Sequence, residues 1–420
     1  MRVLILADSC NPEWASLPSV GYKAARAIAE LAEVVVVTHV RNRENIGKVG
    51  LGRAQVRYID NEYIARPMYK VGKVLRGGTQ TAWTTAVAMA YPSYLTFEWE
   101  AWKATKEELL RGKFDVVHRI TPMSPTLPSP FASWSPVPFV LGPLNGGLRW
   151  LPAFRAELAR EHEWLSYVRS AYRLLPYYKS TYRKSSAVLA AFAHTVEDLP
   201  ACTGPRIINF PEVGIDPTQF DRSAERPVRS QKTILFAGRF VPYKLPDVVV
   251  RAFAGRPALR AHRLIMVGDG PERTAVEQLV RDHNLENQVN LLGWKSQSEV
   301  GQLMREADIF AFPSIRELGA GVVVEAMACG LACVVVNYGA PGTLIAEGRG
   351  IKVPAESRDQ IVRDFGVAFE SLVADERATT RLGKAAREHA MKFYTWEAKA
   401  RKMISVYEWV LGLGEKPSFW

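Results

Sequence analysis

The strongest indication of a chemical function in this sequence is a pair of carboxylates separated by seven residues. Glu317 and Glu325 stand at the ends of this segment, and Gly330 is placed to end the helix that the segment begins. Two glycines, Gly319 and Gly321, lie in the loop just after the first carboxylate. Glycines let backbone N–H groups approach an anion, and a helix N-terminus adds partial positive charge. Phosphate on the amides and sugar hydroxyls on the carboxylates are the contacts that a nucleotide sugar requires.

Two cationic side chains precede this segment in the sequence. Gly238 and Arg239 follow a predicted strand over residues 233–237, and Lys244 stands five residues further on. A guanidinium fork together with an ammonium can hold a diphosphate leaving group. An Arg and a Lys near a loop are usually solvated when taken alone. Their combination with the two glutamates indicates a common site.

A glycine turn follows the next predicted strand. Gly268 and Gly270 enclose an aspartate, and Pro271 then stands at the first position of a helix. The residues leave two interpretations open, a purely structural turn and a loop that lies beside the nucleotide.

The elements that position these residues alternate between strand and helix. Short apolar strands are predicted at 3–7, 34–38, 116–118, 139–142, 187–191, 233–237, 264–267, 289–292, 309–312 and 333–336. Helices are predicted at 20–31, 271–282 and 299–306, and a last one at about 396–411. Alternation of this kind predicts parallel sheets with right-handed crossovers, and continuously apolar strands predict that helices cover both faces.

The length and one polar segment predict two domains. A chain of 420 residues is too long for one ordinary core. Residues 212–231 carry prolines and polar side chains without sustained periodicity, which is typical of a linker. We therefore expect an N-terminal Rossmann-like domain at 1–212, a C-terminal Rossmann-like domain at 213–395, and a helix at 396–420 that crosses back to the first domain.

At this point the chain resembles a known family, the retaining GT-B glycosyltransferases of family 4, also called group 1. The matching residues are 238–239, 244, 267–271, 292–294, 307–308, 313–314, 317 and 325–330. The resemblance covers nearly the whole second half and, more loosely, the first. It implies two doubly wound α/β domains facing a central cleft. It also implies transfer of a sugar from a UDP- or GDP-linked donor to a hydroxyl acceptor, with retention of anomeric configuration.

The resemblance also assigns roles to the residues of the second half. Arg239 and Lys244 would neutralise the diphosphate, Glu317 would contact the donor sugar, and Glu325 the ribose hydroxyls. The remaining donor-binding residues would be Gly238, Gly268, Gly270, Gly319, Ala320, Gly321 and Val322. No metal or other cofactor is implied, because the Arg and Lys supply the electrostatic stabilisation that a cation supplies elsewhere.

The N-terminal domain of such enzymes binds the acceptor. The pieces of this chain that correspond are Gly21, His118 and the loop Asn145-Gly146-Gly147. His118 ends a predicted strand and is either a catalytic side chain in the cleft or a satisfied structural one. The glycine loop is either an ordinary turn or a close approach to a ligand.

The positive charge and the aromatic residues are consistent with binding to an anionic membrane. The net charge is +11, and residues 1–200 hold 25 Lys and Arg against 17 Asp and Glu. Basic aromatic stretches at 68–102 and 155–184 are either core aromatics with a solvated basic face or surfaces for an anionic membrane. The second interpretation fits a lipid-linked or exopolysaccharide acceptor. The short apolar N-terminus and the lack of a spanning segment predict a cytoplasmic protein, peripheral at the inner face of the membrane.

Other functions fit the residues less well. A noncatalytic sensor of nucleotide sugars would keep the donor site and lose acceptor chemistry, so turnover distinguishes it. A phosphorylase would need pyridoxal phosphate on a lysine, and no motif suggests one. No recognition motif supports nucleic-acid binding, and no Gly-x-Gly-x-x-Gly opens the first helix for a dinucleotide. The four cysteines lack the spacing of a zinc site.

Overall fold

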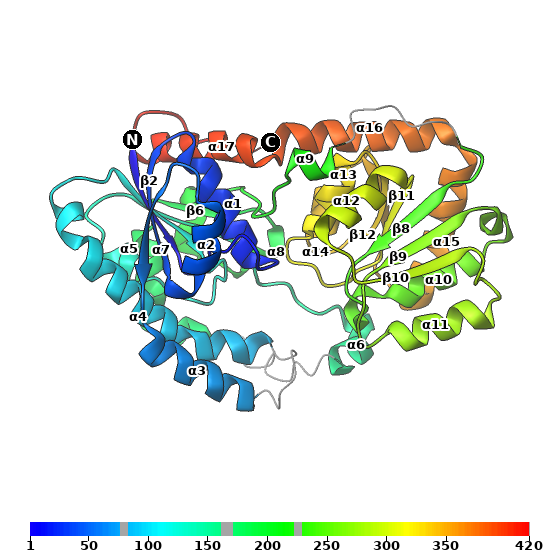
Figure 1. Ribbon diagram of the computed structural model, residues 1–420, viewed down its shortest axis with the longest axis horizontal. Coiled ribbons are helices and arrows are strands. Elements are labelled where there is room, and N and C mark those ends of the chain that lie inside the picture. The colour runs from blue at the N-terminus through cyan, green and yellow to red at the C-terminus, as the bar shows by residue number, and fades with distance from the viewer. Residues whose placement is uncertain (76–82, 161–170, 222–228, 420) are drawn as a thin grey trace. The chain divides into compact units, whose positions relative to one another are not determined.

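The computed structural model describes residues 1–75, 83–160, 171–221 and 229–419, and it divides into two compact units (Figure 1). The first unit comprises residues 1–147, 161–212 and 396–420. The second unit comprises residues 148–160 and 213–395. Residues 148–160 therefore pack with the second unit, whereas the sequence placed them in the first domain.

The first unit is built on a seven-stranded parallel sheet with the strand order β3-β2-β1-β4-β5-β6-β7. Its strands are β1 (Arg2–Ala7), β2 (Glu33–His39), β3 (Gln55–Ile59), β4 (Val116–Thr121), β5 (Phe139–Leu144), β6 (Ala187–Ala190) and β7 (Ile207–Ile208). Its helices are α1 (Leu17–Ala29), α2 (Arg43–Val49), α3 (Glu62–Leu75), α4 (Trp83–Leu110), α5 (Phe131–Trp134), α7 (Tyr178–Lys184), α8 (Ala193–Asp198) and α17 (Trp396–Val410). Helix α17 packs against α1, so the C-terminal helix completes this unit.

The second unit repeats the design with a six-stranded parallel sheet in the order β10-β9-β8-β11-β12-β13. Its strands are β8 (Thr233–Ala237), β9 (Arg263–Val267), β10 (Val289–Gly293), β11 (Ile309–Phe312), β12 (Ala332–Val336) and β13 (Gly350–Val353). Its helices are α6 (Arg155–Arg160), α9 (Pro217–Phe220), α10 (Pro246–Ala254), α11 (Arg273–Asp282), α12 (Gln297–Glu306), α13 (Gly321–Ala328), α14 (Gly339–Leu344), α15 (Arg358–Ala374) and α16 (Glu376–Phe393).

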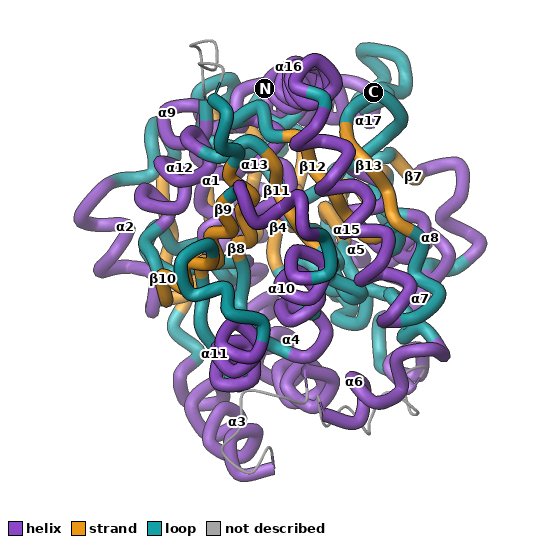
Figure 2. The backbone as a smooth tube through the Cα atoms, turned by 90° about the vertical axis from the view of Figure 1, so that its right-hand side faces the viewer, coloured by secondary structure: helices purple, strands orange, loops and turns teal. Residues whose placement is uncertain are grey.

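Burial explains why the strands are apolar along their whole length. The central strands β1, β4, β8 and β11 are almost fully buried, and helices lie outside the strands in both views of the chain (Figures 1 and 2). A parallel sheet covered on both faces requires apolar side chains on both sides of each strand. The predicted fold class, two Rossmann-like α/β domains, is confirmed.

Three strands were not predicted from the sequence. Strand β3 (Gln55–Ile59) carries Gln and Arg side chains and is mostly half-buried, β7 has only two residues, and β13 contains a lysine. All three lie at sheet edges, where one side of the strand is open. An edge strand does not need the continuous apolar run that identified the others.

Candidate active site

The charged residues of the second unit gather where its strand order reverses. Strands β8 and β11 are neighbours in the sheet, although two other strands separate them in the sequence. Open α/β sheets bind ligands outside the carboxyl ends of such strands, at the point where helices diverge to the two faces. The loop after β8 carries Arg239 and Lys244, and the loop after β11 carries Ser314 and Glu317.

Lys244 and Glu317 form an ion pair across these two loops. The Lys244 ammonium donates to Oε1 of Glu317, and the Ser314 hydroxyl donates to the same oxygen over 2.9 Å. Lys244 is only 9% exposed, and its ammonium lies 4.9 Å from the centre of the Phe312 ring. The fold therefore brings together a carboxylate and a cation, both predicted for the donor site, that are far apart in the sequence. Ser314, to which the sequence analysis gave no role, completes this cluster.

Arg239 is exposed at the same sheet edge. Its guanidinium donates to the Tyr243 hydroxyl over 2.7 Å, and Tyr243 immediately precedes Lys244. An exposed guanidinium keeps most of its donors available for an anion, because a single neutral hydroxyl uses only one of them.

Helix α13 begins after an N-cap residue that makes no capping hydrogen bond with its side chain. Its N-cap residue Ala320 has a left-handed backbone (φ 50°), and the helix starts at Gly321. Uncapped amides at a helix start, together with the helix dipole, favour a bound anion. At the other end, Gly330 takes φ 69° directly after the C-cap Cys329, as predicted for a residue that ends the helix.

Glu325 lies one turn inside α13, where its side chain meets a different partner from that of Glu317. Its Oε1 accepts a hydrogen bond of 3.2 Å from the amide of Gln297, the first residue of α12. The two carboxylates of the seven-residue motif thus sit in different polar surroundings.

The glycines after β8 and β9 hold two loops against each other. A Cβ on Gly268 would lie 1.9 Å from the carbonyl oxygen of Gly238, and one on Gly270 would lie 2.5 Å from that of Phe240. Both glycines also have positive φ, 132° and 153°. Backbone hydrogen bonds join the loops, from Gly238 N to Val267 O among others. These glycines are required by close packing of the backbone, and their contact with a nucleotide stays a prediction.

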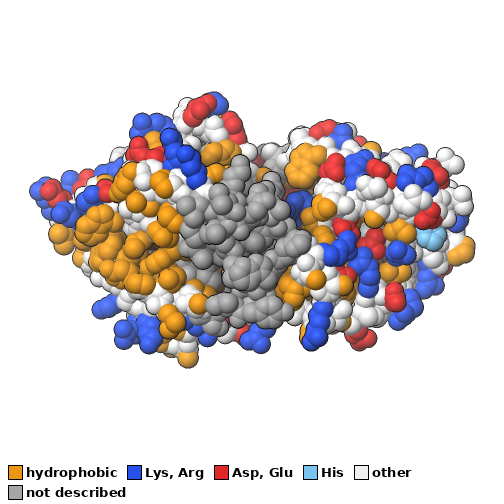
Figure 3. Space-filling model, turned by 90° about the horizontal axis from the view of Figure 1, so that it is seen from below, with side chains coloured by type: hydrophobic (Ala, Val, Ile, Leu, Met, Phe, Trp, Pro, Cys, Tyr) orange, Lys and Arg blue, Asp and Glu red, His pale blue; other side chains and the backbone are white. Residues whose placement is uncertain are grey.

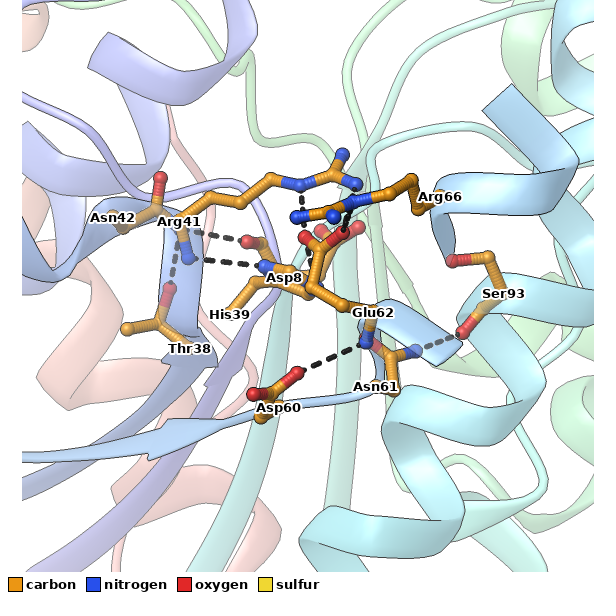
Figure 4. Close-up of polar contacts among 10 residues, drawn as sticks. All are labelled: Asp8, Thr38, His39, Arg41, Asn42, Asp60, Asn61, Glu62, Arg66 and Ser93. Atoms are coloured by element: carbon orange, nitrogen blue, oxygen red, sulfur yellow. Dashed lines mark hydrogen bonds and ion pairs between the residues drawn. The ribbon is translucent and has the colours of Figure 1, made fainter. Parts of the chain in front are cut away.

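The first unit carries a polar cluster at the carboxyl edge of β1, β2 and β3, which the sequence analysis missed (Figure 4). Glu62 is its centre: Arg41 binds both carboxylate oxygens, and Arg66 lies 3.5 Å from Oε2. Asn42 donates to the Asp8 carbonyl and to the Thr38 hydroxyl, both over 2.9 Å. The only sequence signal was a polar residue at the end of each strand.

The pKa values in this cluster shift in opposite directions. Burial raises the pKa of Asp8, although hydrogen bonds to Thr121 and Ser9 oppose the shift. Hydrogen bonding to Arg41 lowers the pKa of Glu62, and burial lowers the pKa of His39. The cluster therefore combines an ionised Glu62 with a neutral imidazole.

His118 lies on β4, fully buried in the first unit. Its Nε2 donates to the Gly142 carbonyl over 2.7 Å, so Nδ1 accepts from the Tyr407 hydroxyl of α17 over 2.6 Å. Burial lowers its pKa to about 4, which keeps the ring neutral. Both nitrogens have protein partners, an arrangement typical of a structural histidine. Its catalytic role stays a prediction.

The predicted acceptor glycines are packed tightly. A Cβ on Gly21 would lie 2.4 Å from the Ser9 carbonyl, and one on Gly147 (φ 81°) would lie 2.4 Å from the His194 carbonyl. Gly146 faces the Pro125 ring, which is 2.7 Å from its hypothetical Cβ. Close packing within the first unit thus accounts for these glycines, and their contact with an acceptor stays a prediction.

Some residues of the predicted membrane surface belong to the core. Tyr178 and Tyr182 are buried and their rings stack edge-on at 5.2 Å. Trp164, Tyr167 and Arg169 lie outside the described residues. Among the described helices, none is both long enough and apolar enough to cross a bilayer.

The described residues also contain no group of three His, Cys, Asp or Glu side chains placed to bind a metal ion.

Two solved structures share this fold over nearly their full length. The sucrose-phosphate synthase of Thermosynechococcus elongatus matches with a TM-score of 0.63 and 17% identity, covering 98% of this chain and 99% of that one. A glycosyltransferase from Rickettsia africae matches with a TM-score of 0.61 and 14% identity, covering 98% of both chains. These likenesses define the fold class, which is GT-B.

Sequence comparison adds a match to a family model. Residues 218–389 match the model of the glycosyl transferases group 1. The D-inositol 3-phosphate glycosyltransferase of Mycobacteroides abscessus is 30% identical over 217 residues, which is 48% of this chain and 46% of the relative. That of Corynebacterium diphtheriae is 33% identical over 185 residues, 42% of each chain. The chain therefore spans about half the length of the curated relatives it matches.

Proposed function

We propose that this protein is a retaining glycosyltransferase that moves a sugar from a UDP- or GDP-linked donor to a hydroxyl group. The observation that carries the proposal is the cluster of Lys244, Ser314 and Glu317 at the switch point of the second sheet. The matched family region, residues 218–389, contains this cluster. Relatives that match part of this chain are named as glycosyltransferases, and the Anabaena HepE structure, similar in fold, holds UDP and glucose.

The chemistry of the second unit supports a role for each group. The diphosphate would lie against the uncapped start of α13 and the exposed Arg239, which add positive charge where the leaving group develops negative charge. Lys244 would then exchange part of its contact with Glu317 for a phosphate oxygen. Glu317, released in part, would accept hydrogen bonds from the sugar hydroxyls.

Metal independence follows from the same proposal. Two cations and a helix start can supply the electrostatic stabilisation that a divalent cation gives in other transferases. Transfer in the presence of a chelator, at the rate found without it, is the expected result.

We further propose that the first unit meets an anionic membrane, because it exposes aromatic and basic side chains together. Trp99 is 49% exposed and Leu174 is 88% exposed, and the Trp134 ring lies within 6.1 Å of both the Trp99 and Tyr177 rings. Figure 3 shows hydrophobic side chains gathered on a face of this unit, with Lys and Arg beside them. Aromatic and basic side chains of this kind favour the interface of an anionic bilayer, which would give access to a lipid-linked acceptor.

A donor screen tests the main proposal. The protein is incubated with UDP- and GDP-sugars and a crude membrane extract as acceptor, and release of the nucleotide diphosphate is measured. Release with one donor, dependent on the extract, is expected. NMR of the product then reports the anomeric configuration. Binding of a nucleotide sugar without turnover in any combination would favour the sensor instead.

A further inference from the structure

Glu317 lies on a loop, so contacts from other segments must hold its backbone. Residues 313–320 connect β11 to α13, and Glu317 stands in the middle of this stretch. In the proposed transfer, Lys244 exchanges part of its contact with Glu317 for a phosphate oxygen, so the carboxylate loses support when it must meet the sugar hydroxyls. A misplacement of roughly 1 Å at such a moment can lower the rate about 100-fold.

The loop that follows β12 holds the backbone of Glu317 on one side. The Glu317 carbonyl oxygen accepts a hydrogen bond of 3.0 Å from the backbone N–H of Ala340. Gly339 lies so close to the same oxygen that a Cβ on it would be 2.6 Å away, and its φ is 60°. The position of this second loop therefore influences the position of Glu317.

A segment from the first half of the sequence contacts the loop after β12. Residues 148–160 pack with the second unit. Leu148 is 2% exposed, and one of its methyl groups lies 3.1 Å from the hypothetical Cβ of Gly339. The Tyr338 hydroxyl donates to the Arg149 carbonyl over 2.6 Å. Two consecutive residues of the segment thus contact two consecutive residues of the loop.

Trp150, the next residue of the segment, contacts the loop of Glu317 itself. The Arg316 guanidinium lies over the Trp150 ring, 4.8 Å from its centre, and Arg316 immediately precedes Glu317. A guanidinium is attracted by the face of a tryptophan ring, and partial burial of both side chains strengthens this contact. Residues 148–150 therefore hold the chain on two sides of Glu317.

The rest of the segment is anchored in the second unit. Phe154 is 1% exposed and belongs to the hydrophobic core of this unit. Glu157 forms an ion pair of 2.5 Å with Arg358, and helix α6 packs on the turn Pro242–Lys244. The segment therefore contacts both of the loops whose charged residues form the ion pair described above, and it is fixed firmly enough to support them.

We propose that Trp150 is a positioning residue for Glu317, and that residues 148–150 clamp the Glu317 loop against the loop after β12. This inference rests on the proposed transferase function and deepens it. In that function Glu317 binds the sugar, whereas Arg239 and Lys244 bind the diphosphate. Loss of the clamp should therefore weaken recognition of the sugar selectively.

A pair of matched ligands tests the clamp. The pair is the nucleotide sugar that supports release in the donor screen and its own nucleotide diphosphate. Calorimetry measures both affinities for the full chain as wild type, Trp150→Leu, Trp150→Phe and Arg316→Gln. Trp150→Phe keeps a ring beneath the guanidinium, and Trp150→Leu keeps apolar bulk without one. Arg316→Gln leaves the Trp150 ring on the core, so it tests the contact even where Trp150→Leu folds poorly.

Trp409→Leu is the matched control. Trp409 is also partly buried, and the Lys416 ammonium lies 5.7 Å from its ring centre, but both residues belong to the first unit. Trp409→Leu and Trp150→Phe should bind both ligands within about twofold of wild type.

Trp150→Leu and Arg316→Gln are expected to weaken binding of the nucleotide sugar roughly 5–30-fold, the effect of losing one cation–π contact. Binding of the nucleotide diphosphate should change by less than about twofold. The combined variant should be no weaker than the weaker single variant, because both substitutions break the same contact.

A merely structural role for Trp150 would lower the unfolding temperature and leave the ratio of the two affinities unchanged, and that result would overturn the clamp. Equal losses for nucleotide sugar and diphosphate would overturn it too. A wild type that releases no nucleotide with any UDP- or GDP-sugar would instead reject the transferase function, and the clamp with it.

Discussion

The two units share one topology and use it differently. Both sheets run outward from a central pair of parallel strands, β1 with β4 and β8 with β11. In the second unit the strand ends carry a nearly buried Lys–Glu pair, an exposed arginine and an uncapped helix start. In the first unit, both ring nitrogens of His118 have protein partners and the glycines are closely packed. Among its buried side-chain atoms without a hydrogen-bond partner in the described part of the chain are Oδ1 of Asn145 and Oε2 of Glu212. The fold supplies the edge, and the side chains there decide which ligand it can bind.

The largest contrast is expected at the charged cluster of the second unit. Lys244→Ala should lower kcat/KM about 100–1000-fold, because one contact to a developing anion is lost, which is roughly 2.7–4 kcal/mol. It should also lower the free energy of unfolding by roughly 3 kcal/mol, since Glu317 is left nearly buried without its ammonium partner. Steady-state kinetics and urea unfolding measure the two effects.

Two further variants separate catalysis from folding at this cluster. Lys244→Ala combined with Glu317→Ala should recover stability and not activity. Arg239→Ala should lose activity with unchanged stability, because Arg239 is exposed. Arg260 is also exposed, and Arg260→Ala should change neither activity nor stability. Full turnover by Lys244→Ala on the true donor would show that the diphosphate assignment is wrong.

The glycine loops of the second unit give the next largest effect. Gly268→Ala should destabilise the protein by roughly 3–5 kcal/mol, because the new Cβ would overlap the Gly238 carbonyl at a positive φ. Gly47→Ala, in helix α2 of the first unit with no atom near its Cβ, should be neutral or stabilising by up to about 1 kcal/mol. Thermal unfolding of both variants tests this, and a Gly268→Ala protein as stable as wild type would contradict the backbone packing described above.

The free energy of unfolding should depend on pH through His118 of the first unit. The pKa of His118 is about 4 when folded and about 6.5 when unfolded, so the unfolded state binds more protons between these values. The His118 contribution to stability is therefore constant above pH 6.5 and falls, by up to about 3 kcal/mol, as the pH drops towards 4. Urea unfolding at pH 7.5, 6 and 5 should show a steeper loss for wild type than for His118→Gln.

His283→Gln, in the second unit, serves as the control for this pH series. It should follow wild type at each pH. Parallel curves for wild type and His118→Gln would mean that folding does not lower the pKa of His118, which would reopen its role as a proton carrier.

The smallest effect concerns the membrane. Liposomes with anionic lipid should sediment the protein at low salt and release it at high salt, because each Lys or Arg near the surface contributes only about 1 kcal/mol and is screened. Trp99→Ala with Leu174→Ala should weaken sedimentation severalfold. Trp294→Ala, an exposed tryptophan of the second unit (69%), should not. Sedimentation that ignores salt and lipid charge would reject the membrane surface.

Much of the second unit could be predicted from the sequence, because its signals are local. The strands 233–237 and 309–312 coincide with β8 and β11, since buried central strands need continuous apolar runs. Gly330 ends α13 as predicted, because a left-handed backbone after a helix favours glycine. The loops that carry Arg239, Lys244 and Glu317 could be placed at one sheet edge for the same reason: carboxyl ends of parallel strands meet there.

Contacts between distant segments could not be predicted in this way. The sequence placed residues 148–160 in the first domain because no composition change marks the point where the chain leaves it. Glu212 looked like the start of a polar linker, yet it is buried against Asn145, and Lys399 of the last helix lies behind it. Nothing local distinguishes these charges from solvated ones, because their burial depends on helix α17 packing against α1.

The sequence by itself determined the two doubly wound domains and the residue types at the ends of their strands, because periodicity and glycine placement act over a few residues. Only the tertiary structure decided that Ser314 and Lys244 share one oxygen of Glu317, and that both ring nitrogens of His118 have protein partners. It also decided which buried side-chain oxygens, Oε2 of Glu212 among them, have no donor within the described residues. The physical reason is that burial and hydrogen-bond partners are set by chain segments that meet only after folding.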